Sequence, residues 1–319
     1  MEPQSKRPGI RAVHSVDDFV IPVPDLAEAE AFYTDFGLDL RRSDDRLALH
    51  PVGHPHAWGH VIQAAGPKRL QYLGFGLYPK DEEAFVLEIE ARGLKTAPHP
   101  ASDGSGCSAH WLQGPDGLAI QLRVAPKVAP SVRAVPHSPA TPPGAGAAPA
   151  RSRAGTVRPR RLSHLLMFAS DVPASIAFYR DVLGLRLSDR SCDGIAFLHG
   201  AHGSDHHLIA LAKSHAGGLH HSSWDVGSEH QVGLGAEHMK ARGHDRGWGL
   251  GRHVLGSNYF YYVRDPWGSY AEYSFDIDHI PADLDWPAAD HPPEDSFYVW
   301  GPAPPADLVT NFEHPAAAG

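Results

Sequence analysis

The strongest constraint on the fold is that the chain contains two copies of one pattern. Residues 16–40 and 162–187 each have the pattern of strand, turn, helix and strand, with the motif Phe-Tyr-x-Asp followed by a glycine. Repetition of this kind indicates two copies of one supersecondary unit packed together. The echo continues in a helix end and in a turn followed by a strand, at residues 88–93 and 237–243 and at residues 114–124 and 265–275. The sequence therefore predicts two homologous domains.

The predicted helix in each copy has matching end signals. Asp25 and Asp171 precede the helices and are suited to the N-cap, and Pro173 is tolerated in a first helical turn. Gly37 and Gly184 follow the helices and suit the left-handed conformation that ends many helices. Each copy is therefore expected to place a helix between its first two strands.

A segment of different composition separates the copies. Residues 124–161 contain no acidic residue and seven lysines and arginines, and proline and alanine dominate. Such a segment cannot bury enough apolar surface to offset the entropy of ordering, so we expect an extended or mobile linker. We expect an N-terminal domain at 10–125, a linker at 126–159, a C-terminal domain at 160–280 and a tail at 281–319.

Composition narrows the class of protein. The chain has 42% apolar residues and a net charge of −9, which argues against a nucleic-acid partner. No run approaches the roughly 18 apolar residues of a membrane span, and the first residues lack the apolar core of a secretory signal. The expectation is a cytoplasmic protein without membrane or nucleic-acid partners, in which Cys107 and Cys192 are free thiols.

The two copies differ at three corresponding positions that bear on chemistry. Offsets of 146, 149 and 151 residues align an aspartate, a tyrosine and a glutamine of the first copy with two histidines and a glutamate of the second. Only the second copy therefore carries a possible ligand set. The pairs are Asp18 and His164, Tyr72 and His221, and Gln121 and Glu272.

Two imidazoles and one carboxylate on three strands have the composition of a facial triad, which binds a divalent metal and leaves positions open for reactants. Fe(II) suits these ligands well, Mn(II) acceptably, and ligand type alone leaves zinc open. Each residue also has an ordinary explanation in a chain with 23 histidines. His164 fits a core histidine, His220 and His221 fit an edge strand, and Glu272 fits a solvent-facing position. Agreement at all three repeated positions favours the metal.

The repeat and its motifs resemble a known family. The segments RLSHLLMF, GLHHSSWDV and YYVRDPWGSYAEYS are together similar to the vicinal oxygen chelate superfamily, and within it to type I extradiol catechol dioxygenases. The resemblance covers nearly the whole chain except the linker. It implies an α+β fold of tandem βαβββ modules that form two open barrels, with metal only in the C-terminal barrel. It implies the ligands His164, His221 and Glu272, with His221 preferred over His220.

The same resemblance implies three residues that handle protons or oxygen. His253 lies nine residues before Tyr262, which lies ten before the glutamate, and both spacings match the family. His207, 14 residues before the predicted ligand His221, best matches the histidine beside bound oxygen, although His206 remains an alternative. A polar strand end is the ordinary explanation for His207, and core packing is that for Tyr262.

The implied reaction is cleavage of a catechol ring beside its diol, with both atoms of O₂ incorporated at an Fe(II) centre. In this scheme Tyr262 and His253 receive a substrate proton, and His207 stabilises reduced oxygen and returns a proton. The alternatives are another metal-dependent enzyme of the superfamily, such as a lyase or epimerase, and a non-catalytic protein that binds an aromatic ligand. The family's habit implies a homo-oligomer.

The tail bears on the substrate. Its aromatic residues either cover the pocket or staple the tail to the barrel, and the sequence leaves both open. We expect a substituted monocyclic catechol, such as a trihydroxytoluene-like ring, with dihydroxybiphenyl-like rings as the competitor. The tail aromatics in question are Trp286, Phe297, Tyr298 and Trp300.

Overall fold

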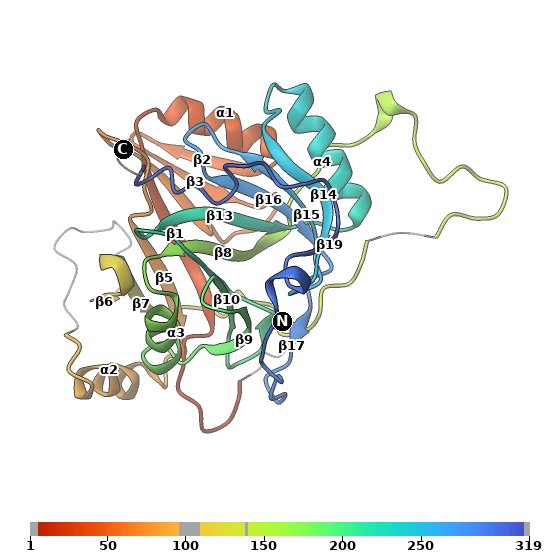
Figure 1. Ribbon diagram of the computed structural model, residues 1–319. Coiled ribbons are helices and arrows are strands. Elements are labelled where there is room, and N and C mark those ends of the chain that lie inside the picture. Colours follow the sequence, from red (N-terminus) through yellow and green to blue (C-terminus); the bar gives the residue numbers. More distant parts are fainter. Residues whose placement is uncertain (1–5, 96–108, 138–139, 316–319) are drawn as a thin grey trace.

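The computed structural model describes residues 6–95, 109–137 and 140–315. The N-terminal copy forms a seven-stranded sheet in the order β2-β3-β4-β1-β5-β7-β6 (Figure 1). Its central strands β1 and β5 pair antiparallel and join the two βαβ-type halves of the copy. Its elements are β1 (Ser15–Val23), α1 (Leu26–Phe36), β2 (Asp39–Ser43), β3 (Arg46–His50), β4 (Gly59–Gln63), β5 (Tyr72–Leu77), α2 (Glu82–Ala91), β6 (Ala109–Gln113), the 3₁₀ turn η1 (Pro115–Gly117) and β7 (Ala119–Val124).

The C-terminal copy repeats this plan in a ten-stranded sheet, in the order β18-β9-β10-β12-β8-β13-β16-β15-β14-β19. Strands β8 and β13 pair antiparallel at its centre, as β1 and β5 do in the first copy. The predicted α+β fold of tandem modules is confirmed. The elements are β8 (Arg161–Ala169), α3 (Val172–Asp181), β9 (Arg186–Ser191), β10 (Ile195–His199), β11 (Ser204–Asp205), β12 (Ile209–Lys213), β13 (Gly218–Asp225), α4 (Glu229–Ala241), β14 (Gly247–His253), β15 (Tyr259–Arg264) and β16 (Tyr270–Phe275).

The expected N-caps and the glycine end of α1 are confirmed, whereas α3 ends at Asp181 with Val182 as its C-cap and Gly184 two residues farther on. The Asp25 side chain accepts hydrogen bonds from two backbone N–H groups of α1, and that of Asp171 accepts one from α3. Gly37 and Gly184 have φ angles of +100° and +75°, in the left-handed region that glycine adopts without a Cβ clash. Local sequence chemistry therefore sets where both helices begin and where α1 ends.

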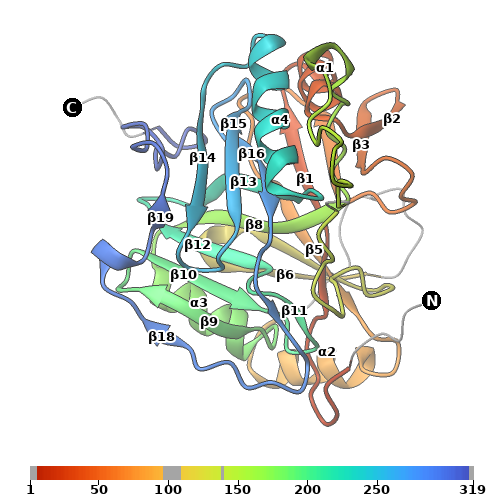
Figure 2. The same cartoon turned by 90° about the vertical axis from the view of Figure 1, so that its right-hand side faces the viewer.

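The two copies pack through their helices. Helices α1 and α4 lie side by side in both views, although they belong to different copies (Figures 1 and 2). The rings of Phe36 on α1 and Tyr273 on β16 stack with centroids 4.0 Å apart, and the Tyr273 hydroxyl donates to the Phe36 carbonyl over 2.8 Å. At Gly37 a Cβ atom would lie 2.2 Å from the Val157 carbonyl oxygen. Close backbone packing thus joins the copies beside α1.

The linker is anchored at both ends and exposed between them. The Ser15 hydroxyl accepts hydrogen bonds from the N–H groups of Val128 and Ala129 over 2.9 Å, and the His137 N–H donates to the Gly227 carbonyl over 2.7 Å. Residues 140–156 are all exposed and form the yellow-green loop that projects from the molecule in Figure 1. The linker therefore combines packed ends with a solvated middle.

The tail crosses the C-terminal sheet from one edge to the other. Strand β18 pairs with β9 at one edge and β19 pairs with β14 at the opposite edge (Figure 2). Near its end, the Glu313 carboxylate accepts hydrogen bonds from the N–H groups of Leu70 and Leu219, one in each copy. The tail is therefore part of the fold. Strand β17 (His279–Ile280) lies just before the tail and pairs with β11. The elements of the tail are β18 (Ala289–Asp290), the 3₁₀ turn η3 (Pro293–Asp295) and β19 (Tyr298–Trp300), and a further 3₁₀ turn in the linker is η2 (Arg151–Arg153).

Two further sequence expectations concern membranes and cysteines. Among the described residues, no helix has the length and apolar character needed to cross a bilayer. Cys192 is an exposed free thiol, and Cys107 lies outside the described residues.

Candidate metal centre and active site

A cavity of about 490 Å³ opens on the C-terminal sheet and is lined by five of the six predicted site residues, and the sixth, Glu272, lies fully buried against His164 and His221. Its apolar wall comes mainly from β8, β10 and β12, and the tail closes part of its mouth. An aromatic ring fits the chemistry of such a wall. The wall and mouth include Leu166, Ile195, Phe197, Ala212, Leu255, Phe297, Leu308 and Val309.

Strand register places the three predicted ligands together. His164 on β8 lies opposite Ser223 on β13, and Ser223 lies opposite Glu272 on β16. His221 is two residues before Ser223 and therefore points to the same face of β13. In the N-terminal copy Asp18, Gly74 and Gln121 have the same register, so the sequence offsets correspond to equal positions in the two sheets.

The three side chains converge on one point. The Nε2 atoms of His164 and His221 lie 3.2 Å apart, and they lie 3.3 and 3.4 Å from Oε2 of Glu272. All three residues are buried, and Glu272 Oε2 has no hydrogen-bond partner. Among the described residues, this is the group of three whose ligand atoms are close enough to hold one metal ion.

Hydrogen bonds behind His221 leave its Nε2 atom without a proton. His220 Nε2 lies 2.8 Å from the Leu308 carbonyl, which only accepts, so this nitrogen carries the proton. His220 Nδ1 is then the acceptor in its 2.7 Å contact with His221 Nδ1. Burial, then the neighbouring His220 and His164, lowers the pKa of His221 well below its usual value. The second histidine of the pair thus supports the first as a ligand.

A similar arrangement supports His164. Its Nδ1 atom lies 3.3 Å from the Ser163 hydroxyl, which donates to the Asp205 carboxylate over 3.1 Å. Since the Ser163 proton is committed to Asp205, the hydroxyl oxygen accepts from His164 Nδ1–H. The Nε2 lone pair of His164 therefore also faces the centre.

Asn258 orients the third ligand. Its amide donates to Glu272 Oε1 over 3.1 Å and to the Ser274 hydroxyl over 3.0 Å, and it is almost fully buried. One carboxylate oxygen is thereby held on β15's side while Oε2 turns toward the two histidines. No repeat or spacing in the sequence singles out Asn258.

The donor set fits a divalent metal. Two imidazole lone pairs and a carboxylate oxygen meet in a buried place with no proton between them, which is unfavourable unless a cation lies among them. Three ligands on one face of an octahedron, each about 2.1 Å from a metal, are about 3.0 Å apart. The separations of 3.2–3.4 Å are close to this value.

The corresponding place in the N-terminal copy has different chemistry. Asp18 lies 3.5 Å from the guanidinium of Arg123, which also bonds to Asp17. The other two positions are a phenol, Tyr72, and an amide, Gln121. A protein cation therefore neutralises the carboxylate, and the side chains form a poor ligand set for a divalent ion.

His253 and Tyr262 lie on β14 and β15 at one side of the predicted ligands. His253 Nδ1 contacts the Phe297 carbonyl at 3.0 Å and its Nε2 contacts the Tyr262 hydroxyl at 2.9 Å. Because the carbonyl only accepts, Nδ1 carries the proton and Nε2 accepts the Tyr262 O–H. Burial, then the nearby Glu272 carboxylate, raises the pKa of Tyr262 well above its usual value. Tyr262 is therefore a neutral phenol whose proton points toward His253.

His207 lies on the other side, in the turn between β11 and β12. Its ring centroid is 4.0 Å from that of His164, and its side chain lines the cavity. His206 instead points to Asp189, 2.9 Å from its Nε2 atom. Of the two residues left open by the sequence, the structure thus places His207 at the cavity and His206 behind it.

The tail aromatics divide between the two roles that the sequence left open. Phe297 lines the cavity, whereas Trp286 donates to Asp189 behind His206. Tyr298 packs against Trp248, and Trp300 is partly exposed on the edge strand β19. Sequence reasoning missed the tail's main contribution, which is the backbone carbonyls that bond to histidines.

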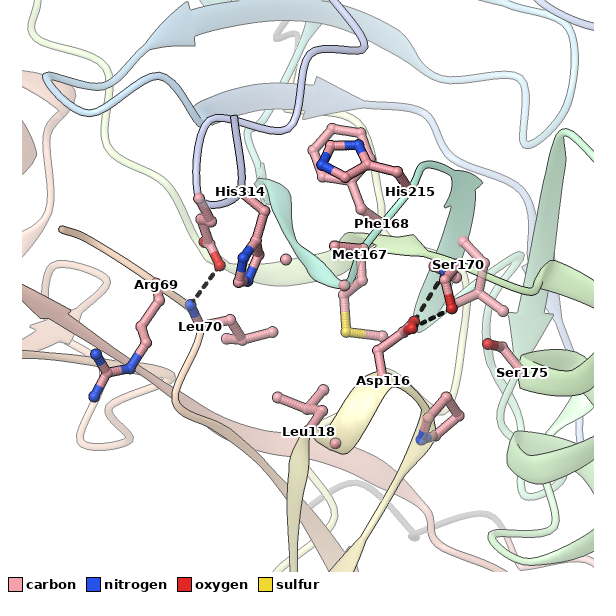
Figure 3. A pocket seen from close by; sticks show the side chains of 18 of the residues that line it. Arg69, Leu70, Asp116, Leu118, Met167, Phe168, Ser170, Ser175, His215 and His314 are labelled. Atoms are coloured by element: carbon pink, nitrogen blue, oxygen red, sulfur yellow. Dashed lines mark hydrogen bonds between the residues drawn. The ribbon is translucent and has the colours of Figure 1, made fainter. Parts of the chain in front are cut away.

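A second cavity, of about 450 Å³, lies where the copies meet (Figure 3). Leu118 lines it from the N-terminal copy and Met167 from the C-terminal copy. The Asp116 carboxylate accepts from the Ser170 N–H over 3.0 Å, so its acid group is used in joining the copies. None of the predicted site residues lines this cavity.

Comparison with known proteins agrees with the repeat. Residues 15–122 and 161–273 both match the Glyoxalase/Bleomycin resistance protein/Dioxygenase superfamily. The chain is 46% identical over 314 residues to Metapyrocatechase 2 of Cupriavidus necator, and the match covers 97% of each chain.

Solved structures share the fold. The Mn(II)-bound glyoxalase from Novosphingobium aromaticivorans aligns with a TM-score of 0.73 at 25% identity, over 92% of this chain and 93% of that one. An extradiol ring-cleaving dioxygenase from B. fuscum also has a TM-score of 0.73, at 19% identity, over 95% of this chain and 84% of that one. The chain belongs to the Glyoxalase/Bleomycin resistance protein/Dioxygenase superfamily, among its extradiol dioxygenases.

Proposed function

We propose that the protein is an Fe(II)-dependent extradiol dioxygenase that cleaves a substituted monocyclic catechol, with His164, His221 and Glu272 as metal ligands. Catechol ring cleavage itself follows from the 46% identity to Metapyrocatechase 2 over nearly the whole length. The observation that carries the assignment of the site is the convergence of two imidazole nitrogens and one buried carboxylate oxygen beside an apolar cavity that both histidines line. The metal, when bound, supplies open positions for the diol and O₂ and transfers electron density between them.

Tyr262 and His253 provide a route for a substrate proton. The Tyr262 hydroxyl donates to His253 Nε2, so its own oxygen is free to accept from a catechol hydroxyl. As that hydroxyl ionises, its proton passes to Tyr262 and the phenolic proton passes to His253. The Phe297 carbonyl bonded to His253 Nδ1 then stabilises the imidazolium.

His207 approaches the centre from the side of His164. Its position beside a predicted ligand suits a group that contacts O₂ and exchanges a proton with it. The apolar wall excludes water, which strengthens each of these hydrogen bonds. We also propose a cytoplasmic homo-oligomer, as the family resemblance implies, and light scattering of the purified protein measures its mass.

The test is anaerobic purification with metal analysis, followed by oxygen-electrode assays with a panel of catechols. We expect roughly one iron per chain and oxygen uptake that matches the yellow ring-cleavage product. Reconstitution of metal-free protein with Mn(II) or Zn(II) gives the comparison. Full activity with zinc, or no oxygen uptake with any diol, would contradict the proposal. Higher kcat/KM for dihydroxybiphenyl than for alkyl-substituted catechols would contradict the proposed substrate.

A further inference from the structure

A buried hydrogen-bonded chain leads from His207 away from the metal ligands, and the proposed reaction uses only its first residue. We propose that His206 and Asp189 are positioning residues that hold His207 with an unprotonated Nε2 toward the substrate and that exchange protons with it. This inference rests on the proposed dioxygenase function and deepens it.

The contacts of the chain are short and shielded from water. His207 Nδ1 lies 3.0 Å from His206 Nδ1, and His206 Nε2 lies 2.9 Å from Asp189 Oδ2. The relative exposures of His207, His206 and Asp189 are 3%, 1% and 5%. Hydrogen bonds in such surroundings have few competing partners, so each fixes where its proton lies.

Asp189 is the end of the chain and its fixed acceptor. Burial opposes its ionisation, but hydrogen bonds from His206, His291 and the Ala289 N–H outweigh burial and lower the pKa of Asp189 to about 2. The carboxylate also accepts from the Trp286 indole over 3.2 Å. An ionised carboxylate has no proton to donate, so His206 Nε2 must carry one.

That proton determines the tautomer of the next ring. In the resting arrangement that we propose, His206 has a single proton, on Nε2, so its Nδ1 accepts the Nδ1–H of His207. His207 therefore has its lone pair on Nε2, the nitrogen on the opposite side of the ring from the contact with His206. Because the His207 side chain lines the cavity, it meets the reactants as a proton acceptor first.

The same contacts allow a balanced proton transfer in both directions. When Nε2 of His207 takes a proton from the catechol hydroxyl that does not donate to Tyr262, its Nδ1 proton moves to Nδ1 of His206. His206 becomes an imidazolium paired with Asp189, and His207 remains neutral but now has a donor proton on Nε2. Return of this Nε2 proton to reduced oxygen reverses both transfers, so no net proton is consumed. The positive charge thus lies one residue farther from the metal than it would on His207.

The tail supplies the partners that hold Asp189 in place. Ala289 pairs with Asp189 in the β9 and β18 ladder, and His291 Nε2 lies 2.8 Å from Asp189 Oδ1. Trp286 both donates to Asp189 and packs edge-on against His206, with ring centroids 5.5 Å apart. These contacts explain why the tail crosses this edge of the sheet.

The kinetic test is Asp189→Asn, which keeps the shape of the side chain but removes the charge that pairs with the His206 imidazolium. We expect the metal content to stay unchanged, KM for the catechol to change less than about threefold, and kcat to fall about tenfold or more. The double variant of Asp189→Asn with His207→Phe should be no slower than His207→Phe alone, because both act through one ring. Additive losses or a wild-type kcat would overturn the proposal.

The matched control is Asp290→Asn. Asp290 lies on β18, the short strand that pairs with β9 beside Asp189. The Asp290 carboxylate accepts from the Cys192 N–H and pairs with Arg190, and it has no link to His207. It tests whether loosening the tail is enough to slow turnover. We expect kcat within about threefold of the unmodified enzyme, and an equal loss in both variants would assign a purely structural role to Asp189.

A spectroscopic test does not depend on turnover. In metal-free protein with ¹⁵N-labelled histidine, His207 should show a protonated Nδ1 and an unprotonated Nε2, assigned by loss of its signals in His207→Phe. A proton on Nε2 instead would overturn the proposal. If no diol is cleaved by the unmodified enzyme, the proposed function fails, whereas cleavage together with the opposite tautomer rejects only the positioning role.

Discussion

Each of the three predicted ligands is expected to be required, because among the described residues they form the group of three whose ligand atoms meet at one point. We predict that His164→Ala, His221→Ala and Glu272→Ala each abolish metal retention and ring cleavage, since two remaining ligands bind a divalent ion too weakly. Metal analysis after gel filtration measures the first effect and the oxygen electrode the second. Retention of a full equivalent of metal by any of these variants would show that its residue is not a ligand.

The N-terminal copy and the neighbour of His221 provide the controls. Asp18→Ala and Gln121→Ala should leave the metal content intact, because their sheet holds an arginine cation instead of a metal-binding set. His220→Ala should retain the ligands but weaken metal binding by about 10- to 100-fold, since the bond that sets the His221 tautomer is lost. A greater loss in His220→Ala than in His221→Ala would reverse their roles.

Removal of the proton route should separate chemistry from metal binding. We predict that His253→Phe and Tyr262→Phe retain iron while kcat falls by about a hundredfold or more, because the substrate proton loses its acceptor. Stopped-flow absorbance under anaerobic conditions then shows whether the bound catechol ionises more slowly. Unchanged kcat in both variants would contradict the mechanism while leaving the metal site intact.

For single residues, the sequence predicts the side chains of the site better than the groups that hydrogen-bond to them and hold them in place. Comparison of the two copies was enough to select His164 and Glu272, because it showed where the chain had changed one residue type for another. Asn258 and the carbonyls of Phe297 and Leu308 were not predicted. A backbone carbonyl has no residue signature, and the tail contacts join residues 44 and 88 positions apart.

Gly37 shows that the residue at a helix end can be constrained both by its own backbone conformation and by a segment that packs against it. Gly37 and Gly243 follow helices with φ angles of +100° and +93°, but only Gly37 is crowded. A Cβ on Gly37 would lie 2.2 Å from the Val157 carbonyl oxygen, whereas no described atom lies within 4 Å of one on Gly243. The two glycines therefore form a matched pair.

We predict that Gly37→Ala destabilises the protein by about 2–4 kcal/mol and Gly243→Ala by about 1 kcal/mol. The cost of placing alanine at a positive φ angle is common to both variants. The difference between their losses of stability therefore measures the close contact of Val157, at the end of the linker, with Gly37 at the end of α1. Chemical unfolding followed by circular dichroism measures the free energy of unfolding of each variant. Equal losses would mean that the contact with Val157 adapts without cost.

Helices whose ends are set by nearby residues could be predicted from the sequence. Short strands that form only by pairing with strands far away in the sequence could not. Asp25 and Asp171 cap their helices as expected, because capping depends on residues only two or three positions away. The short strands β18 and β19 were not anticipated. Their formation depends on free edges of β9 and β14, and composition alone does not reveal such edges.

Over the whole molecule, the exposed part of the linker should be dispensable. We predict that replacing residues 140–154 by a short flexible connector leaves kcat and metal content within about threefold of the unmodified protein, because these residues are solvated. Ser15→Ala should instead lower stability by about 1–3 kcal/mol, since two N–H groups of the anchored linker end lose their acceptor. Loss of activity on shortening would show that the loop takes part in assembly or catalysis.

The path of the tail has a consequence for how the enzyme comes into being on the ribosome. The residues that would bind metal are complete once Glu272 has been made, yet the carbonyl of Leu308 that sets the His221 tautomer follows 36 residues later. Glu313, which bonds to both copies, emerges later still. A chain that lacks residues 308–313 thus has its predicted ligands without the bonds that prepare them, so such a truncation should weaken metal binding without removing a ligand.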